Sequence, residues 1–209
     1  MSETSPEGLR LTAPGVHAPI ADYAAAKDCL RQYGIGLWRH DLSDLSPALL
    51  AILDKERPSA AELEELKTAM LFDRETLRAY IRGSDRAEAV DGGGALETRV
   101  VNHGYDYPQL FLVEAGIDYS RFDSYHVNTA DDGTAVDEVI QILCGAGVRV
   151  FHRVAGGEVS LRLDAPSAHR GWILSYSGGQ PHIGSFTEAE VGTKALVQVI
   201  GPPLWTMRY

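Results

Sequence analysis

The hydrophobic pattern of the chain changes near its middle. Up to about residue 90 the apolar residues recur at helical spacing, and from about residue 96 they fall in short β-rich runs. Between the two parts lies the glycine-rich segment DGGGA, residues 91–95, which favours a flexible hinge. We therefore expect a helical region over residues 21–90 and a β-barrel domain over residues 96–209. A flexible, proline-containing arm is expected over residues 1–20.

Capping residues divide the helical region into four predicted helices. Ser46 and Pro47 are suited to the N-cap and first turn of one helix, and Ser59 with Glu62 forms a capping box at the start of the next. The last two helices are short and closely joined, so they resemble a helix-turn-helix. The expected helices cover residues 21–33, 46–54, 60–71 and 73–83.

Eight predicted strands follow the hinge, with glycine-containing turns between several of them. Many short strands after a helical lead indicate a mainly β protein, built as a double-sheet jelly roll or a small barrel. The expected strands cover residues 98–102, 109–113, 124–129, 136–143, 148–154, 158–163, 172–176 and 196–200.

The charge of the chain argues against a general nucleic-acid-binding surface. The formal net charge is −10, whereas phosphate contacts require clustered lysine and arginine. Arg74, Arg78 and Arg82 do form a row at four-residue spacing, but on so acidic a chain a solvated helix face is the better interpretation.

The cysteines and the hydropathy pattern favour a cytoplasmic protein. Cys29 and Cys144 are the only two cysteines and have no CxxC spacing, so neither a disulfide framework nor a thiolate zinc site is indicated. The N-terminus lacks an apolar signal region, and no stretch has the eighteen or more apolar residues of a membrane helix. We expect reduced thiols and no contact with a membrane.

The candidate chemistry begins with two glycines and a histidine near the end of the chain. Gly171, Gly179 and His182 have the spacing of the second motif of cupin barrels, in which a glycine turn presents a metal-binding histidine. Upstream, Glu138 and Gly145 have the spacing of the second half of the first cupin motif.

Strand alternation places a carboxylate inside the predicted barrel. Glu138 shares its strand face with Ile140 and Ile142, and a charge on such a face is costly unless it is paired or binds a cation. His126 and Asn128 would share one face of a neighbouring strand.

These residues suggest a mononuclear iron site. His126, Glu138 and His182 form a two-histidine, one-carboxylate set, which leaves open positions on a non-haem Fe(II) for substrate and dioxygen. Asn128 is expected to be a weak ligand or a hydrogen-bonding group for substrate. The other histidines with no ligand spacing are expected at the surface or behind the ligands: His103, His152 and His169.

The order of elements resembles a known family. A helical lead, a glycine-rich join and one C-terminal cupin are similar to the phosphonate-processing non-haem iron enzymes, such as hydroxypropylphosphonate epoxidase, hydroxyethylphosphonate dioxygenase and methylphosphonate synthase. The resemblance implies Fe(II), a cupin fold, and an arginine and a tyrosine that hold the phosphonate before the first motif. Arg99 and Tyr107 occupy that region.

The expected function is therefore an Fe(II)-dependent cupin oxygenase or oxidase for a small anionic substrate, and the resemblance implies an organophosphonate of specialised metabolism. Lys194 is expected to help neutralise the substrate, and Tyr176 and Gln180, which flank the His182 turn, to support catalysis. Two alternatives remain open. One is a cupin isomerase, cyclase or lyase with a Lewis-acid metal or no metal, and the other is a ligand-sensing transcriptional regulator. A homo-oligomer is compatible with all three.

Overall fold

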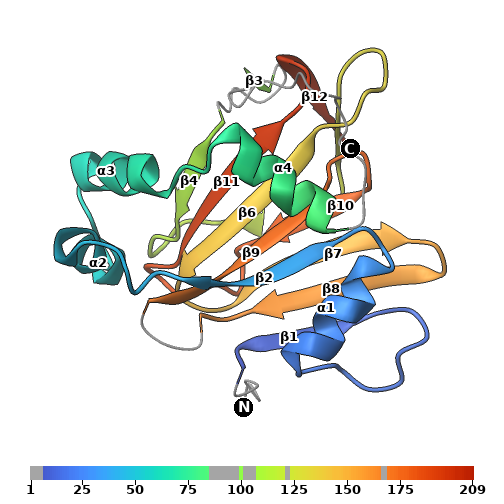
Figure 1. Cartoon of the computed structure of the whole chain (residues 1–209), viewed down its shortest axis with the longest axis horizontal. Helices are drawn as coiled ribbons and strands as arrows, with labels where there is room; N and C mark the ends of the chain where they lie inside the picture. Colours follow the sequence, from blue (N-terminus) through green and yellow to red (C-terminus); the bar gives the residue numbers. More distant parts are fainter. Residues whose placement is uncertain (1–6, 85–98, 101–106, 121–122, 166–168) are drawn as a thin grey trace.

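The computed structural model describes residues 7–84, 99–100, 107–120, 123–165 and 169–209. This part of the chain is mainly β, with antiparallel sheets and four helices toward the N-terminus, as the hydrophobic pattern predicts (Figure 1). The helices are α1 (Tyr23–Arg31), α2 (Pro47–Asp54), α3 (Ala60–Met70) and α4 (Arg74–Gly83). The first six strands are β1 (Leu9–Thr12), β2 (Gly36–Asp41), β3 (Arg99–Val100), β4 (Gln109–Leu112), β5 (Val127–Thr129) and β6 (Asp137–Cys144). The others are β7 (Val148–Val154), β8 (Gly157–Leu163), β9 (Arg170–Ser177), β10 (His182–Ser185), β11 (Lys194–Ile200) and β12 (Leu204–Arg208).

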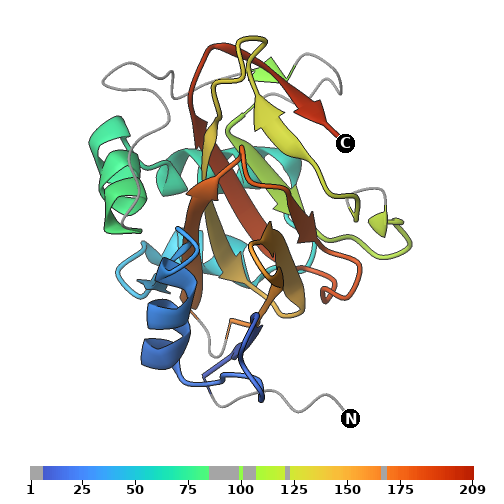
Figure 2. The ribbon, with the colours of Figure 1, turned by 90° about the vertical axis from the view of Figure 1, so that its right-hand side faces the viewer.

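Two larger sheets face each other across the core. One has the strand order β2-β9-β6-β11-β4, the other β1-β8-β7-β10, and the third, smaller sheet has the order β3-β12-β5. A single cluster of buried side chains includes Ile140 and Leu174 from the first sheet and Val150 and Leu161 from the second. Because one cluster draws on both sheets, their inner faces enclose a shared core, and Figure 2 shows this layered arrangement.

Strand β6 shows why the five-stranded sheet is buried on both faces. Ile140 and Ile142 lie in the core between the sheets, whereas Val139 and Leu143 belong to clusters under the helices. The alternation predicted for Glu138 and the two isoleucines is confirmed.

Helices α2, α3 and α4 cover the outer face of the same sheet. Leu77 of α4 packs against Val139, and Leu53 and Leu66 of α2 and α3 pack against Leu143 (Figure 1). The pair predicted to resemble a helix-turn-helix, α3 and α4, thus docks on the sheet through separate clusters. No helix in the described residues is long and apolar enough to cross a membrane.

The predicted helix starts are confirmed by their caps. The Ser46 side chain accepts a hydrogen bond from a backbone N–H in the first turn of α2, and Pro47 occupies the first helical position. At α3, Ser59 and Glu62 exchange both hydrogen bonds of the capping box.

The N-terminal segment differs from its prediction. The expectation of a flexible arm is wrong for residues 9–12, which form β1 and pair with β8. Leu9 and Leu11 are buried while Arg10 and Thr12 are exposed. This alternation is too short to predict a strand in a segment that contains several prolines. The predicted helical region also contains β2, an edge strand of the five-stranded sheet. The predicted hinge at residues 91–95 lies outside the described residues.

The side chain of Lys194, the first residue of β11, forms hydrogen bonds with the end of α2. Its side chain is 1% exposed, and the ammonium donates hydrogen bonds to the carbonyls of Leu53 (2.9 Å), Lys55 (2.7 Å) and Gly192 (3.0 Å). Leu53 and Lys55 lie at the C-terminal end of α2, where carbonyls have no partner within the helix. The buried charge therefore satisfies backbone acceptors that the fold would otherwise bury without donors.

Replacing Lys194 with methionine is expected to lower the free energy of unfolding by about 1–3 kcal/mol, because the carbonyls lose their donor while the side-chain volume is kept. Urea unfolding followed by circular dichroism measures the change. Lys67→Met is the matched control, since Lys67 forms only a 3.5 Å ion pair with the exposed Glu64 on α3. Equal stability of the two variants would contradict this role of Lys194.

Candidate functional site

Side chains from both large sheets and from β5 meet at one end of the core. His126, Asn128, Glu138, Tyr176 and His182 are far apart in sequence, yet each contacts at least one other member. We call this group the Glu138 cluster. It contains the three predicted metal ligands, His126, Glu138 and His182.

Strand register creates the Glu138 cluster. Glu138 of β6 lies directly opposite Tyr176 of β9. His126 and His182 form an antiparallel bridge, with backbone N–O distances of 3.1 and 3.0 Å in the two directions. Because opposite residues of neighbouring strands point to the same face, each pair presents its side chains together.

The carboxylate of Glu138 is held by several donors. Its Oε2 accepts a hydrogen bond from the hydroxyl of Tyr176 (2.9 Å), and its Oε1 accepts one from the amide of Asn128. Nε2 of His182 lies 3.3 Å from Oε1 without the angle of a hydrogen bond, so this contact is mainly electrostatic. Glu138 is 6% exposed and His182 is 1% exposed, so both groups are shielded from water.

The environment keeps the Glu138 carboxylate ionised. Burial acts to raise its pKa, but the charge and contact of His182, the charge of His126 and the Tyr176 hydrogen bond outweigh this effect and lower the pKa to about 2. Burial and the charge of Glu138 raise the pKa of Tyr176 well above its usual value, so the phenol stays protonated and donates. For His182, the charge of Glu138 overcomes the opposing effect of burial and raises the pKa.

Both imidazoles of the predicted ligand set are oriented by backbone carbonyls. Nδ1 of His182 lies 2.8 Å from the carbonyl oxygen of Gln180, and Nδ1 of His126 lies 3.0 Å from that of Ser124. A carbonyl oxygen only accepts, so each Nδ1 carries the hydrogen and each ring presents Nε2 as its donor atom toward a ligand.

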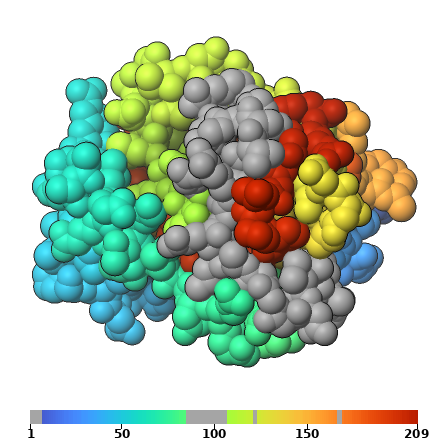
Figure 3. Space-filling view, turned by 90° about the horizontal axis from the view of Figure 1, so that it is seen from above, coloured from blue at the N-terminus to red at the C-terminus, as the bar shows by residue number. Residues whose placement is uncertain are grey.

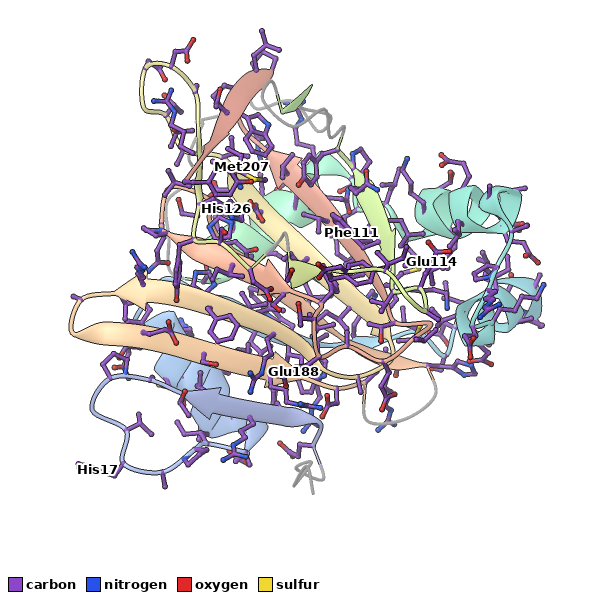
Figure 4. All side chains as sticks on the ribbon, turned by 180° about the vertical axis from the view of Figure 1, so that it is seen from behind. His17, Phe111, Glu114, His126, Glu188 and Met207 are labelled. Carbon is purple, nitrogen blue, oxygen red and sulfur yellow. The ribbon has the colours of Figure 1, made fainter. Side chains whose placement is uncertain are left out.

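The cluster reaches the surface on the His126 side, where β12 passes. His126 is only partly buried, and the ring of Tyr209 lies 6.0 Å from it. Met207 pairs with Asn128 across the strands, and Figure 4 shows Met207 close to His126. Seen from above, β12 lies at the surface beside the loop near Asp131, to which it is joined by an ion pair from Arg208 (Figure 3).

The donor set suits a divalent cation, although the third ligand is not yet in place. Within the part of the chain that the structure describes, His182 Nε2 and Asn128 Oδ1 are buried and have no hydrogen-bond partner. Glu138 and His182 are already adjacent. As the side chains stand, however, no three histidine, cysteine, aspartate or glutamate side chains among the described residues are close enough together to hold a metal ion. Binding would require an imidazole to turn toward the Glu138–His182 pair.

Other predicted site residues have different positions. Tyr107 lies near the cluster: its ring is 5.6 Å from that of the buried Trp205, and it is close enough to Tyr176 to help raise the pKa of that phenol. Gln180 contributes its backbone carbonyl, whereas its side-chain amide donates to the carbonyl of Arg153 at the surface (3.4 Å). Its predicted catalytic side chain therefore lies away from the carboxylate.

The structure contradicts the predicted substrate-binding role of Lys194. Lys194 pairs with Cys144, whereas Val199 pairs with Glu138. Val199 lies five residue steps along β11 from Lys194, which corresponds to about 17 Å. The ammonium donates its hydrogen bonds to carbonyls near α2, so it cannot neutralise a substrate at the Glu138 cluster. Arg99 begins β3, and its side chain lies outside the described residues.

His152 was expected at the surface or behind the ligands, and the structure places it in the interior beside the cluster. This residue is 1% exposed and lies directly opposite His182 on β7. Its ring centroid is 4.5 Å from that of Tyr176 and 5.9 Å from that of His182. The alternation of Val148, Val150 and His152 indicates an inward direction, but the pairing of β7 with β10 depends on a long connection that carries no clear register signal.

Tyr176→Phe is expected to lower the free energy of unfolding by about 1.5–3 kcal/mol, because a buried carboxylate loses its phenolic donor. Chemical unfolding of metal-stripped protein measures the loss. Tyr125→Phe provides a matched control, since the Tyr125 hydroxyl donates to the carboxylate of Glu158 at the surface, where water can replace it. A loss no larger than that of the control would show that Glu138 does not depend on Tyr176.

Comparison with models of known protein families and with curated protein sequences gives no match for this chain.

Proposed function

We propose that the protein is a mononuclear Fe(II)-dependent oxygenase or oxidase with a cupin-type barrel, acting on a small anionic substrate. The observation that supports this most directly is the pairing of a buried Glu138 carboxylate with His182, beside His126, on strands that the cupin spacing had singled out. Buried carboxylates are costly unless they are paired or bind a cation, and this one contacts Nε2 of His182 and lies within the electrostatic influence of His126.

In this proposal Glu138, His126 and His182 hold the metal. Bound Fe(II) would supply open positions for substrate and dioxygen and the redox chemistry of oxidation. The hydroxyl of Tyr176 and the amide of Asn128 orient the carboxylate, and the carbonyls of Gln180 and Ser124 orient the rings. These contacts fix the carboxylate and each ring, and metal binding would still require an imidazole to turn toward the Glu138–His182 pair.

The substrate part of the proposal rests on fewer residues. An organophosphonate remains the proposed class, with Arg99 as its cationic partner and the hydroxyl of Tyr107 as a neutral donor. The electrostatic influence of Tyr107 on Tyr176 supports this choice, because it requires the two phenols to be close to each other. Lys194 has no part in it, because its ammonium is bound at the end of α2.

Metal binding is the first test. Stripped wild-type protein titrated anaerobically with Fe(II) or Co(II) is expected to bind one equivalent, and Glu138→Ala and His182→Ala are expected to lose this binding because each removes a donor from the adjacent pair. Isothermal titration calorimetry gives stoichiometry and affinity. His169→Ala is the control, since His169 contacts Asp54 far from the cluster on the surface. One equivalent retained by both cluster variants would exclude Glu138 and His182 as ligands.

Activity is the second test. Iron-loaded protein is expected to consume dioxygen when hydroxyalkylphosphonates are added, as followed with an oxygen electrode, and the Glu138→Ala protein is expected not to. Consumption independent of added phosphonate would contradict the substrate class. Consumption unchanged in the variant would contradict the site.

A second candidate is an isomerase or lyase in which Glu138 and His182 work as an acid–base pair without a metal. The observation that favours it is their 3.3 Å contact, which is already formed in a buried setting, together with a pKa of His182 raised by the carboxylate. Turnover that survives exhaustive treatment with a chelator would favour this candidate over the oxygenase.

A further inference from the structure

Three arginines form a row across the outer face of the four-stranded sheet. Arg162 of β8 lies directly opposite Arg10 of β1 on one side and Arg149 of β7 on the other. Their neighbours along the strands, such as Val150 and Leu161, belong to the core, so alternation turns the arginines outward. We call these three residues the arginine row. Like charges directly opposite each other destabilise a sheet, so the row depends on counter-charges.

Two carboxylates supply part of that counter-charge. Glu188 bridges two members of the row, with its Oε1 2.7 Å from Arg149 Nη1 and its Oε2 3.4 Å from Arg162 Nη1. Figure 4 shows Glu188 beside the strands of this sheet. Asp164 accepts a hydrogen bond from Nε of Arg162 (3.3 Å), and Arg10 forms no ion pair with any of the described residues. Three guanidinium groups therefore share two carboxylates, on a chain whose formal net charge is −10.

A hollow of about 270 Å³ adjoins the row at Arg149. Its lining includes Phe151 and Ile183, which lie directly opposite each other on β7 and β10, and Glu188. Nε of Arg149 is buried and has no hydrogen-bond partner in the described part of the chain, so the contact with Glu188 leaves this donor unsatisfied. An anionic group that bound through Nε and a terminal nitrogen together would satisfy it.

Two further carboxylates at the hollow have donors of their own. Asp123 accepts a hydrogen bond from the hydroxyl of Thr187 (2.8 Å), and Glu158 accepts one from the hydroxyl of Tyr125. Glu158 also lies directly opposite Arg153 across the β7–β8 pair. Neither carboxylate forms an ion pair with the arginine row in the described residues, so Glu188 is the hollow's own counter-ion for Arg149.

We propose that the arginine row and this hollow bind a small molecule that carries a carboxylate or phosphate group on an apolar body of about one ring. In this structure Glu188 holds the position of the ligand's anionic group, because its carboxylate already bridges two arginines. Glu188 lies in a turn and its side chain is 49% exposed, so it can give way to a ligand. The apolar body packs on Phe151 and Ile183.

The proposed site is separate from the Glu138 cluster. It lies on the outer face of β7 and β10, whereas His152 and His182 lie on the inner face of the same two strands. The sheet itself therefore stands between the two sites, and the binding inferred here does not depend on the proposed iron chemistry.

Titration of the metal-stripped full-length protein with benzoate and with phenyl phosphate at low ionic strength tests the proposal. Two-dimensional proton–nitrogen NMR gives both the affinity and the location of binding. At least one probe is expected to bind with shifts in the amides of β7 and β10 around Arg149, about tenfold or more tightly than acetate or inorganic phosphate, which lack the ring. The tighter of the two probes identifies the anionic group. Absence of binding by both, or shifts confined to the Glu138 cluster, would overturn the inference.

Substitutions in the site are expected to act in opposite directions. Arg149→Gln weakens binding by at least about tenfold, because it removes a charged donor. Glu188→Gln tightens binding by about threefold or more, because the competing carboxylate is lost. Arg82→Gln and Glu75→Gln are the matched controls, since they break an exposed 2.8 Å ion pair on α4. If Glu188→Gln bound no more tightly than wild type, the Arg149–Glu188 contact would be structural and the inference would fall.

Discussion

The structure depends on how it accommodates one buried negative charge. Glu138 lies on the inner face of β6, where its neighbours on the same face are isoleucines, and an ionised carboxylate there would cost several kcal/mol without partners. Tyr176, Asn128 and His182 supply those partners from other strands. The pairing of β6 with β9 and the bridge between His126 and His182 therefore both serve to bring partners to the Glu138 carboxylate.

The same arrangement explains why polar side chains are buried at the Glu138 end of the core between the two large sheets. Hydrophobic packing of α2, α3 and α4 on the outer face holds β6 and β9 in place, so the Glu138 cluster does not have to stabilise the fold by itself. A rigid scaffold with a concentrated set of oriented donors at one end is the arrangement expected of a binding or catalytic centre. A cation would add favourable electrostatics to a site that already orients its imidazoles through Nδ1.

Much of the fold could be predicted because its signals are local. The cap of Ser46 and the capping box of Ser59 and Glu62 locate helix starts within a few residues, and alternation in β6 gives the inward direction of Glu138 without any knowledge of its partners. The short strand β1 was not predicted, because its alternation covers only four residues and the prolines in the same segment favour a loop.

The candidate site was harder to predict, because its contacts depend on pairing between distant strands. Lys194 was expected to help neutralise the substrate, but its position on β11 puts it at the opposite end of that strand from the residue that pairs with Glu138. His152 looked isolated in sequence, and only the pairing of β7 with β10 places it beside His182. Gln180 flanks the predicted turn as expected, yet its side-chain amide donates to the carbonyl of Arg153 and only its own carbonyl lies at the site.

The central claim is tested most directly by crystallography. The protein would be crystallised anaerobically with Fe(II), and anomalous diffraction data would be collected on both sides of the iron absorption edge. The account predicts a single strong anomalous peak within bonding distance of a Glu138 carboxylate oxygen and of His182 Nε2. A map without a peak there, with the Glu138–His182 contact retained in iron-saturated crystals, would contradict it.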